Sequence, residues 1–328
     1  MRTRPVLLAL AGVWLLTGCA GPAQRVGESS PETLALSRKA EAFDLQAHAG
    51  GRGWVFPGNV LPAFEYALDL QVTTLELDMN YTRDGVIIVI HDRSIPQEWD
   101  IDPDATGSLP PDPSTASPGQ LAIKTLTLEQ IRKYRCPLAE NIREFPGRSS
   151  DIPLLTDTEY CSIPTLEEVF QFVRDYAASE HKTQAQRDNA AKVQFNIETK
   201  TRGFEQQVVD TVKRFDLEDR VMVQSFDHRS IATISQLDPR IRTSALDGIP
   251  SRIVRDTKAA IWSPRYPRVT AENVKEAHDL GLLVIPWTVD NPEAMENLID
   301  LGVDGIITNV PDVLQEILKE RGIPFAPR

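Results

Sequence analysis

The chain has 328 residues, 41% of them hydrophobic and 25% charged, and its formal net charge is −12. This is the composition of a globular protein, and the acidic surface argues against nucleic-acid binding and against adsorption to anionic lipid through charge. The length would suit two average domains, although an α/β barrel of about 250 residues folds as one.

Residues 1–18 have the features of a lipoprotein signal peptide. Arg2 and Arg4 precede an apolar stretch, 6–16, that is too short to span a bilayer as a mature helix. The sequence Leu16-Thr17-Gly18-Cys19 resembles a bacterial lipobox, so we expect cleavage before Cys19 and lipidation of that residue. Ala20, rather than an aspartate, follows the cysteine, and the resemblance to sorted bacterial lipoproteins then implies the outer membrane. The alternative is an ordinary signal peptide with a chance cysteine.

Two cysteines, Cys136 and Cys161, remain in the predicted mature protein. An exported chain folds in an oxidising compartment, so we expect these two to form a disulfide, with two unpaired thiols as the alternative. They are too few to form a zinc site by themselves.

After a polar tether at 19–40, the region 41–328 alternates apolar runs with segments of helical spacing. Strands are predicted at 43–49, 73–79, 86–91, 193–199, 221–226, 243–246, 284–288 and 305–308, and a short apolar run at 259–262 is ambiguous. Helices are predicted at 60–70, 166–177, 204–215, 271–280, 292–301 and 311–320. This alternation predicts an α/β fold, either a closed eight-stranded barrel or an open doubly wound sheet.

Two features interrupt the alternation. The six residues 80–85 leave no room for a crossover helix between the second and third strands. After the third strand come two long stretches rich in Pro, Asp and Ser, at about 93–127 and 137–164, which we interpret as insertions. In a barrel, their position after a strand end would place both above the catalytic face.

Several side chains of the predicted strands suit phosphodiester chemistry. Glu76 and Asp78 lie on one face of their strand, and two neighbouring carboxylates call for a cation or for solvent. Glu198 and Lys200 share a face of a later strand, whereas His48 and His91 each end a strand. Each feature alone has a simpler explanation, such as solvated acids or histidines that cap strands.

Taken together and in order, these residues resemble the glycerophosphodiester phosphodiesterase family. The resemblance extends from about residue 44 to 311 and rests on the following segments: His48-Ala49-Gly50, Pro57-Gly58-Asn59, Glu76-Leu77-Asp78, Thr82-Arg83-Asp84-Gly85, His91-Asp92, Glu198-Thr199-Lys200, Ser225-Phe226, Trp287-Thr288-Val289 and Ile307-Thr308-Asn309-Val310-Pro311. It implies a single TIM (β/α)8-type barrel like that of phospholipase-C-like phosphodiesterases.

The resemblance also implies roles for individual residues. Glu76, Asp78 and Glu198 would bind one divalent cation, Ca²⁺ or Mg²⁺, and His48 and His91 would form an acid/base pair. Lys200, Ser225 and Trp287 would line the substrate pocket. The nucleophile would be water or the neighbouring glycerol hydroxyl.

The chain departs from the family pattern beside the first histidine. Ala49 stands where the family has an arginine that holds the phosphate, and we expect Arg52 to substitute for it. Gly58 and Val60 replace the glutamate and threonine of a Pro-Glu-Asn-Thr motif. These replacements predict a weakened or shifted substrate preference.

The leading interpretation is hydrolysis of glycerophosphodiesters to glycerol 3-phosphate and an alcohol by an enzyme anchored in the cell envelope. One alternative is a lysophospholipase-D-like enzyme acting on lysolipids. Another is a non-catalytic envelope lipoprotein that retains the barrel. A glycosidase is disfavoured because Glu76 and Asp78 are neighbours on one strand, whereas glycosidase carboxylates flank the sugar.

Overall fold

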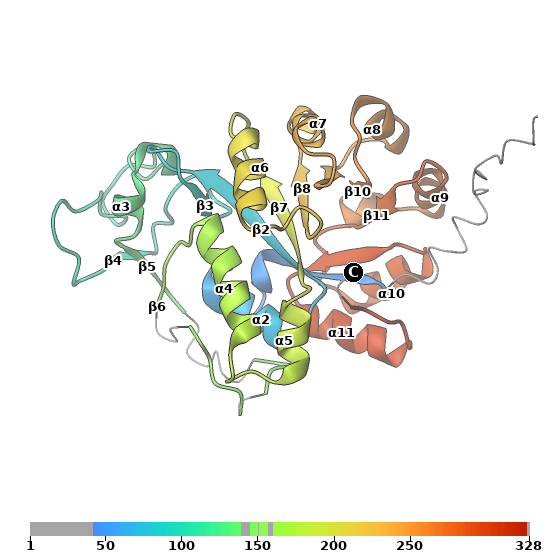
Figure 1. Ribbon diagram of the computed structural model, residues 1–328, viewed down its shortest axis with the longest axis horizontal. Helices are drawn as coiled ribbons and strands as arrows, with labels where there is room; N and C mark the ends of the chain where they lie inside the picture. The colour runs from blue at the N-terminus through green and yellow to red at the C-terminus, as the bar shows by residue number, and fades with distance from the viewer. Residues whose placement is uncertain (1–41, 139–144, 150, 157–159, 327–328) are drawn as a thin grey trace, which may run out of the picture. The chain divides into compact units, whose positions relative to one another are not determined.

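The computed structural model describes residues 42–138, 145–149, 151–156 and 160–326. Its centre is a sheet of eight parallel strands in the order β11-β10-β9-β8-β7-β2-β1-β12 (Figure 1). The strands are β1 (Asp44–Ala47), β2 (Thr74–Tyr81), β7 (Gln194–Thr199), β8 (Val221–Ser225), β9 (Arg242–Leu246), β10 (Ile261–Ser263), β11 (Leu283–Val284) and β12 (Gly305–Thr308). The sheet nearly closes into a barrel, as expected from the family resemblance, because Asp304 N–H donates to Val284 O at 2.9 Å and Ile307 N–H to Pro286 O at 3.0 Å.

One predicted strand lies outside the barrel. The run at 86–91 forms β3 (Ile87–Val89), which pairs antiparallel with β2 through Met79 and Val89. The short connection between the two strands permits a hairpin but not a parallel crossover. The eighth parallel strand is instead β10, formed from the ambiguous run at 259–262 and flanked by β9 and β11.

Helices cover the outside of the barrel. They are α2 (Leu61–Asp69), α4 (Leu166–Ala178), α5 (Gln184–Ala190), α6 (Glu205–Arg214), α7 (His228–Leu237), α8 (Pro250–Asp256), α9 (Ala271–Asp279), α10 (Pro292–Asp300) and α11 (Pro311–Glu320). Capping residues determine where several of these helices begin. For example, Thr165 and Glu168 form a capping box at the start of α4. Hydrophobic spacing did not predict α5, α7 or α8.

The alternation of side chains along the strands gives the barrel two different surfaces. Leu75, Leu77 and Met79 of β2 are fully buried in the main core, so the side chains between them face the barrel interior. A small apolar cluster, formed by Met222, Ile261, Ile285 and Ile307, fills part of that interior. The remainder is polar and includes the two acids of β2.

The first insertion folds beside the barrel. It contains β4 (Asp100–Ile101) and the 3-10 turn η2 (Ile123–Thr125), and it is followed by α3 (Leu128–Ile131) and β5 (Tyr134–Pro137). Strands β4, β5 and β6 (Tyr160–Cys161) form a small antiparallel sheet. Cys136 and Cys161 are direct partners in this sheet, with Cα atoms 5.1 Å apart, and a disulfide joins them.

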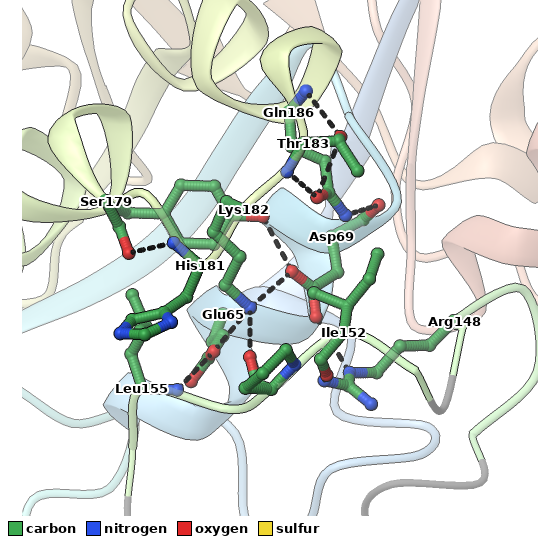
Figure 2. A network of polar contacts seen from close by, with 12 residues as sticks. Glu65, Asp69, Arg148, Ile152, Leu155, Ser179, His181, Lys182, Thr183 and Gln186 are labelled. Atoms are coloured by element: carbon green, nitrogen blue, oxygen red, sulfur yellow. Dashed lines mark hydrogen bonds and ion pairs between the residues drawn. The ribbon is translucent and has the colours of Figure 1, made fainter.

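The described part of the second insertion does not lie above the catalytic face, contrary to the prediction. A group of buried charges holds it against α2 and the connection between α4 and α5 (Figure 2). Lys182 Nζ contacts Glu65 Oε1 at 2.7 Å and Asp69 Oδ1 at 2.8 Å, and the Lys182 and Glu65 side chains have no exposed surface. Arg148 Nε reaches Asp69 Oδ2 at 2.7 Å. Asp69 and Lys182 come shortly before β2 and β7, so this cluster lies toward the amino ends of those strands.

Glu65 and Lys182 also bind the backbone of the insertion. Leu155 N–H donates to Glu65 Oε1 at 2.6 Å, and Thr156 N–H donates to Glu65 Oε2 at 2.9 Å. Lys182 Nζ donates to Pro153 O at 2.9 Å. These bonds satisfy buried charges that burial alone would penalise, and they fix the position of the segment.

The predicted signal peptide, Cys19 and the whole of the predicted tether lie outside the described residues. Within the described part of the chain, every helix is too short or too polar to cross a bilayer.

Candidate metal and catalytic site

Three carboxylates from two neighbouring strands converge at the carboxyl end of the barrel. In the parallel register of β2 and β7, Asp78 lies opposite Glu198, and Glu76 lies opposite Asn196. One carboxylate oxygen from each of Glu76, Asp78 and Glu198 lies within 4.8 Å of the others. Glu76 and Asp78 are almost completely buried, and the Glu198 side chain is 10% exposed.

The pKa values of the three acids show that their negative charges are only partly neutralised. Burial, and then the charge of Asp78, raise the pKa of Glu76 to about 8. Burial and Asp78 likewise raise the pKa of Glu198 to about 7. Burial alone would raise the pKa of Asp78 too, but Lys200, His48 and His91 together lower it below its ordinary value. The cluster therefore has more negative charge than the surrounding protein neutralises.

Lys200 is the cation that the protein supplies to this cluster. Its Nζ lies 2.9 Å from Asp78 Oδ1 and 2.9 Å from Glu198 Oε1. Burial opposes the charge of Lys200, but the two acids outweigh that effect and raise its pKa. When all three carboxylates are ionised, a single ammonium neutralises only one of their three charges.

Polar neighbours that were not predicted hold the acids in place. Ala49 N–H donates to Glu76 Oε2 at 3.0 Å, and Gln224 Nε2 donates to Glu76 Oε1 at 2.7 Å. Asn59 Nδ2 donates to Asp78 Oδ2 at 2.8 Å, and Asn59 Oδ1 accepts from the Asp78 backbone N–H at 3.0 Å. Asn59 belongs to the Pro57-Gly58-Asn59 motif, which was the signal available in the sequence.

His48 faces the acids, and its contacts with Asn309 and, through it, Asp290 fix its orientation. Its Nε2 lies 3.9 Å from Glu76 Oε2, and its Nδ1 lies 2.6 Å from Asn309 Oδ1. Asn309 Nδ2 donates to Asp290 Oδ2 at 2.6 Å, so the Asn309 oxygen must be the atom that faces the imidazole. Nδ1 of His48 therefore carries the proton, and Nε2 is directed toward the carboxylates.

His91 lies near the mouth of the same site. Its side chain is 48% exposed, and its Nδ1 lies 2.9 Å from Asp92 Oδ1. Asn80 Nδ2 donates to Ile90 O at 2.9 Å and to Asp92 O at 3.2 Å, which anchors the backbone on both sides of His91. Both imidazoles are close enough to Asp78 for their charge to lower its pKa.

The predicted substrate-binding residues lie around these groups in different ways. Arg52 lies over the Phe56 ring, 6.0 Å from its centroid, and lines a pocket together with His91. Ser225 lines an adjoining hollow with Glu198 and Lys200, although its hydroxyl donates to Thr199 O at 3.1 Å.

Trp287 contributes an aromatic face rather than a donor. Its indole N–H donates to Ser263 O at 2.8 Å, and its ring meets the Phe226 ring edge-on with the centroids 5.5 Å apart. The N–H is therefore already satisfied within the protein.

The two departures from the family pattern are in contact. Gly58 has a φ of 75°, and a Cβ at this position would lie 2.9 Å from Ala49 Cβ and 2.7 Å from Arg52 Cβ. A glutamate at position 58 would not fit this loop conformation. The arginine and the glutamate of the family motif are thus replaced together by two small residues that pack against each other.

The cluster fits a hard divalent cation. Such ions bind carboxylate oxygens, and the three acids offer one oxygen each within a single coordination sphere. Asp78 Oδ1 is buried and, apart from its ion pair with Lys200, has no hydrogen-bond partner among the described residues. Among the described residues, Lys200 is the only ammonium or guanidinium group that pairs with these three acids.

Comparisons with known proteins agree with the geometry. Residues 50–313 match the model of the glycerophosphoryl diester phosphodiesterase family. A glycerophosphodiester phosphodiesterase of Caldanaerobacter subterraneus is 29% identical over 84% of this chain and 98% of its own length. The structure is similar to that of a Silicibacter pomeroyi protein assigned as a glycerophosphoryl diester phosphodiesterase, with 25% identity, a TM-score of 0.69, and coverage of 89% of this chain and 99% of that one.

A further structural neighbour is a phosphodiesterase of Oleispira antarctica in complex with the product sn-glycerol-3-phosphate. It is 16% identical, has a TM-score of 0.60, and is matched over 85% of this chain and 97% of its own, so it supports the fold. The family match covers most of the barrel, including every residue of the acid cluster. The chain therefore belongs to the glycerophosphoryl diester phosphodiesterase family and is an enzyme of that family.

Proposed function

We propose that the protein hydrolyses glycerophosphodiesters to glycerol 3-phosphate and an alcohol. The observation that carries this proposal is the convergence of Glu76, Asp78 and Glu198 within 4.8 Å, with Lys200 among them and His48 Nε2 directed at them. The product found in the Oleispira antarctica neighbour supports the same substrate class.

In this proposal the three carboxylates hold one divalent cation, Ca²⁺ or Mg²⁺. When bound, the ion neutralises the phosphate and the charge that develops on it during the reaction. Lys200 supplies a fixed positive charge beside Asp78 and Glu198. Arg52, Ser225 and Trp287 surround the substrate.

His48 and His91 act as the acid/base pair of this mechanism. One imidazole removes a proton from the attacking oxygen, and the other protonates the oxygen of the departing alcohol. Asn309 and Asp290 fix the tautomer of His48, whereas Asp92 holds the ring of His91. The exposed position of His91 gives the alcohol a path to solvent.

The surroundings of the site favour a water-soluble substrate over a lysolipid. Two adjoining hollows beside Glu198 and Lys200 are lined mostly by charged and hydroxyl side chains. An acyl chain would need a continuous apolar groove to offset its exposure to water. Phe226, which is 48% exposed, is the one large apolar side chain that lines the hollow containing Glu198, so this hollow does not provide such a groove.

We further propose that the mature enzyme is attached to the envelope through a lipid on Cys19, in the outer membrane. The lipobox-like Leu16-Thr17-Gly18-Cys19 supports this proposal. A Cys19→Ser variant is expected to leave the membrane fraction, and a variant that stays there would contradict the proposed anchor.

The enzymatic proposal is tested by hydrolysis of glycerophosphocholine, glycerophosphoethanolamine and a lysolipid, with Ca²⁺, Mg²⁺ or a chelator. We expect activity on the first two that chelation abolishes. His48→Ala and His91→Ala are each expected to lower kcat by about a thousandfold, because each removes a proton-transfer group. His181→Ala, which changes an exposed histidine outside the site, is the matched control. Full activity in both active-site variants would contradict the assigned roles.

A further inference from the structure

A basic groove extends from the acid cluster toward the first insertion. One hollow is lined by Glu198, Lys200, Ser225 and three arginines, Arg93, Arg202 and Arg229. A second hollow is lined by residues that include Asn80, Lys124 and Lys200. Both hollows include Arg93, Lys200 and Thr201, so they form one continuous groove.

The charge of this groove is opposite to that of the chain. Outside the acid cluster, four cationic side chains line it, and the only carboxylate among its lining residues is Asp227. Asp227 pairs with Arg229 at 2.9 Å and lies 3.8 Å from Arg202. The groove therefore has an excess of three positive charges on a chain whose formal net charge is −12.

Arg93 and Lys124 account for most of this excess. Both are exposed, and among the described residues neither side chain has an ion pair or a hydrogen bond to a protein acceptor. They belong to the first insertion, where Ile123 N–H donates to Arg93 O at 2.9 Å and holds the two backbones side by side. An insertion thus brings two unpaired cations to the mouth of a site that already contains a lysine.

The opposite side of the site has a different character. The pocket between Arg52 and His91 is lined mostly by apolar residues such as Phe56, Trp99 and Ile163, together with two acids, Asp92 and Glu98, and its volume is only about 50 Å³. The two hollows of the basic groove have volumes of about 380 and 660 Å³, which lie in the range of about 300–1,000 Å³ that is usual for ligand sites. The groove can hold the alcohol part of a diester, whereas the small pocket cannot.

From these observations we infer that the enzyme prefers glycerophosphodiesters whose alcohol part carries its own anionic group, such as a phosphate. The inference rests on the proposed function. The alcohol extends from the acid cluster into the basic groove, where Arg93 and Lys124 bind its anionic group and Arg202 adds to the local positive potential. The phosphate of the cleaved bond remains at Lys200 and the three acids.

The test compares two substrates that differ by one phosphate, glycerophosphoinositol and glycerophosphoinositol 4-phosphate. With the full-length enzyme, we expect kcat/KM to be at least tenfold higher for the phosphorylated compound, and this advantage should shrink as ionic strength rises. The double variant Arg93→Gln/Lys124→Gln should reduce the ratio of the two kcat/KM values toward one. The single charge reversal Arg93→Glu should lower it below one.

A control removes two charges elsewhere. Lys258, which precedes β10 at the amino end of the barrel, and Lys275 of α9 are both exposed and line neither hollow. The double variant Lys258→Gln/Lys275→Gln should keep the wild-type ratio. Equal kcat/KM for the two substrates in the wild type, or an unchanged ratio in Arg93→Gln/Lys124→Gln, would overturn the inference. A higher kcat/KM for glycerophosphocholine than for either inositol compound would also overturn it.

A binding measurement separates this inference from the proposed function. Calorimetric titration of myo-inositol 1,4-bisphosphate in the presence of a chelator needs neither turnover nor metal. Binding that weakens at least tenfold in Arg93→Gln/Lys124→Gln supports the groove even if no diester is hydrolysed. Absence of binding, or equal binding by both proteins, overturns the inference even if glycerophosphodiesters are hydrolysed.

Discussion

Gln224 donates a hydrogen bond from Nε2 to Glu76 Oε1 over 2.7 Å, so that a buried amide on β8 fixes a carboxylate on β2. The same Gln224 accepts from Asn196 Nδ2 at 3.0 Å, and Asn196 Nδ2 also donates to Gln46 Oε1 at 2.8 Å. Gln46 Nε2 in turn donates to Asp44 Oδ2 at 2.9 Å. A chain of buried amides thus crosses the barrel interior and ends on a proposed metal ligand.

This relationship predicts the effect of changing Gln224. A Gln224→Leu variant frees Glu76 to rotate and removes a donor that stabilises its charged form. We expect the affinity for Ca²⁺ or Mg²⁺ to fall about 10- to 100-fold, as is typical when a residue that orients a metal ligand is lost. Calorimetric titration of the metal measures this affinity. Gln315→Leu, which removes a buried amide bonded to Leu70 O, is the control and should leave metal affinity unchanged.

Metal binding should also depend on pH. The raised pKa values of Glu76, about 8, and Glu198, about 7, mean that these groups hold protons near neutrality in the metal-free protein. A cation must displace those protons, so we expect metal affinity to rise from pH 6 to pH 8.5 and protons to be released on binding. Titrations in two buffers of different ionisation enthalpy measure the release. Affinity that is constant over this range would contradict the prediction.

The same shifts affect the stability of the metal-free protein. A carboxyl whose pKa is raised on folding, here from 4.5 to about 8 for Glu76, binds more protons in the folded state than in the unfolded state. Its contribution to the free energy of unfolding therefore decreases as pH rises from about 4.5 to 8. In chelator, Glu76→Gln should lose this decrease, and saturating metal should restore the stability of the wild type at pH 8. Denaturant unfolding at several pH values tests both statements.

Asn309 predicts a positioning effect on His48. Asn309→Leu removes the acceptor of the Nδ1 proton, so that the ring can rotate or adopt the other tautomer. We expect kcat to fall about 10- to 100-fold with little change in KM, and the pH profile of kcat to shift because the contact that orients the imidazole is gone. Asn309→Asp keeps an acceptor for Nδ1 but loses the donor to Asp290 and places two carboxylates side by side, so it should recover only part of the rate. An Asn309→Leu enzyme with wild-type kcat and pH profile would exclude the role.

The group of buried charges that holds the second insertion predicts that removing Lys182 will lower the stability of the protein strongly. Lys182→Met leaves Glu65 without its ammonium partner, and it leaves Asp69 with Arg148 as its remaining ion-pair partner and with the Tyr176 hydroxyl as a neutral donor. Breaking a buried pair from one side typically costs about 3–5 kcal/mol in the free energy of unfolding. Urea unfolding measures this cost, and limited proteolysis should show faster cleavage in the insertion.

Lys275→Met is the matched control for this prediction. It removes an exposed ion pair with Asp279, a contact of a kind that contributes about 0.3–0.5 kcal/mol. Similar losses in the two variants would show that the buried cluster does not hold the insertion.

The site illustrates what the sequence predicts and what it does not. The shared strand face of Glu76 and Asp78 follows from the alternation of side chains, and it is present in β2. The meeting of Asp78 with Glu198 depends on the parallel register of two strands that lie 120 residues apart in the chain, and the resemblance to a family supplied it in advance. The contact of Gln224 with Glu76 could not be predicted in this way, because no local sequence pattern distinguishes a glutamine that points into the barrel from any other glutamine on an apolar strand.

The sequence by itself determined most of the strands, six of the helices and the faces on which their polar residues lie, because backbone geometry imposes periods of two and 3.6 on any chain. Only the tertiary structure decided that β3 pairs antiparallel with β2 outside the barrel and that β10 takes its place among the parallel strands. It also decided that Lys182 and Arg148 hold the second insertion against α2. Those outcomes depend on contacts between residues far apart in the chain, and on whether each buried charge has a partner in the folded protein. Local sequence patterns contain no information on either point.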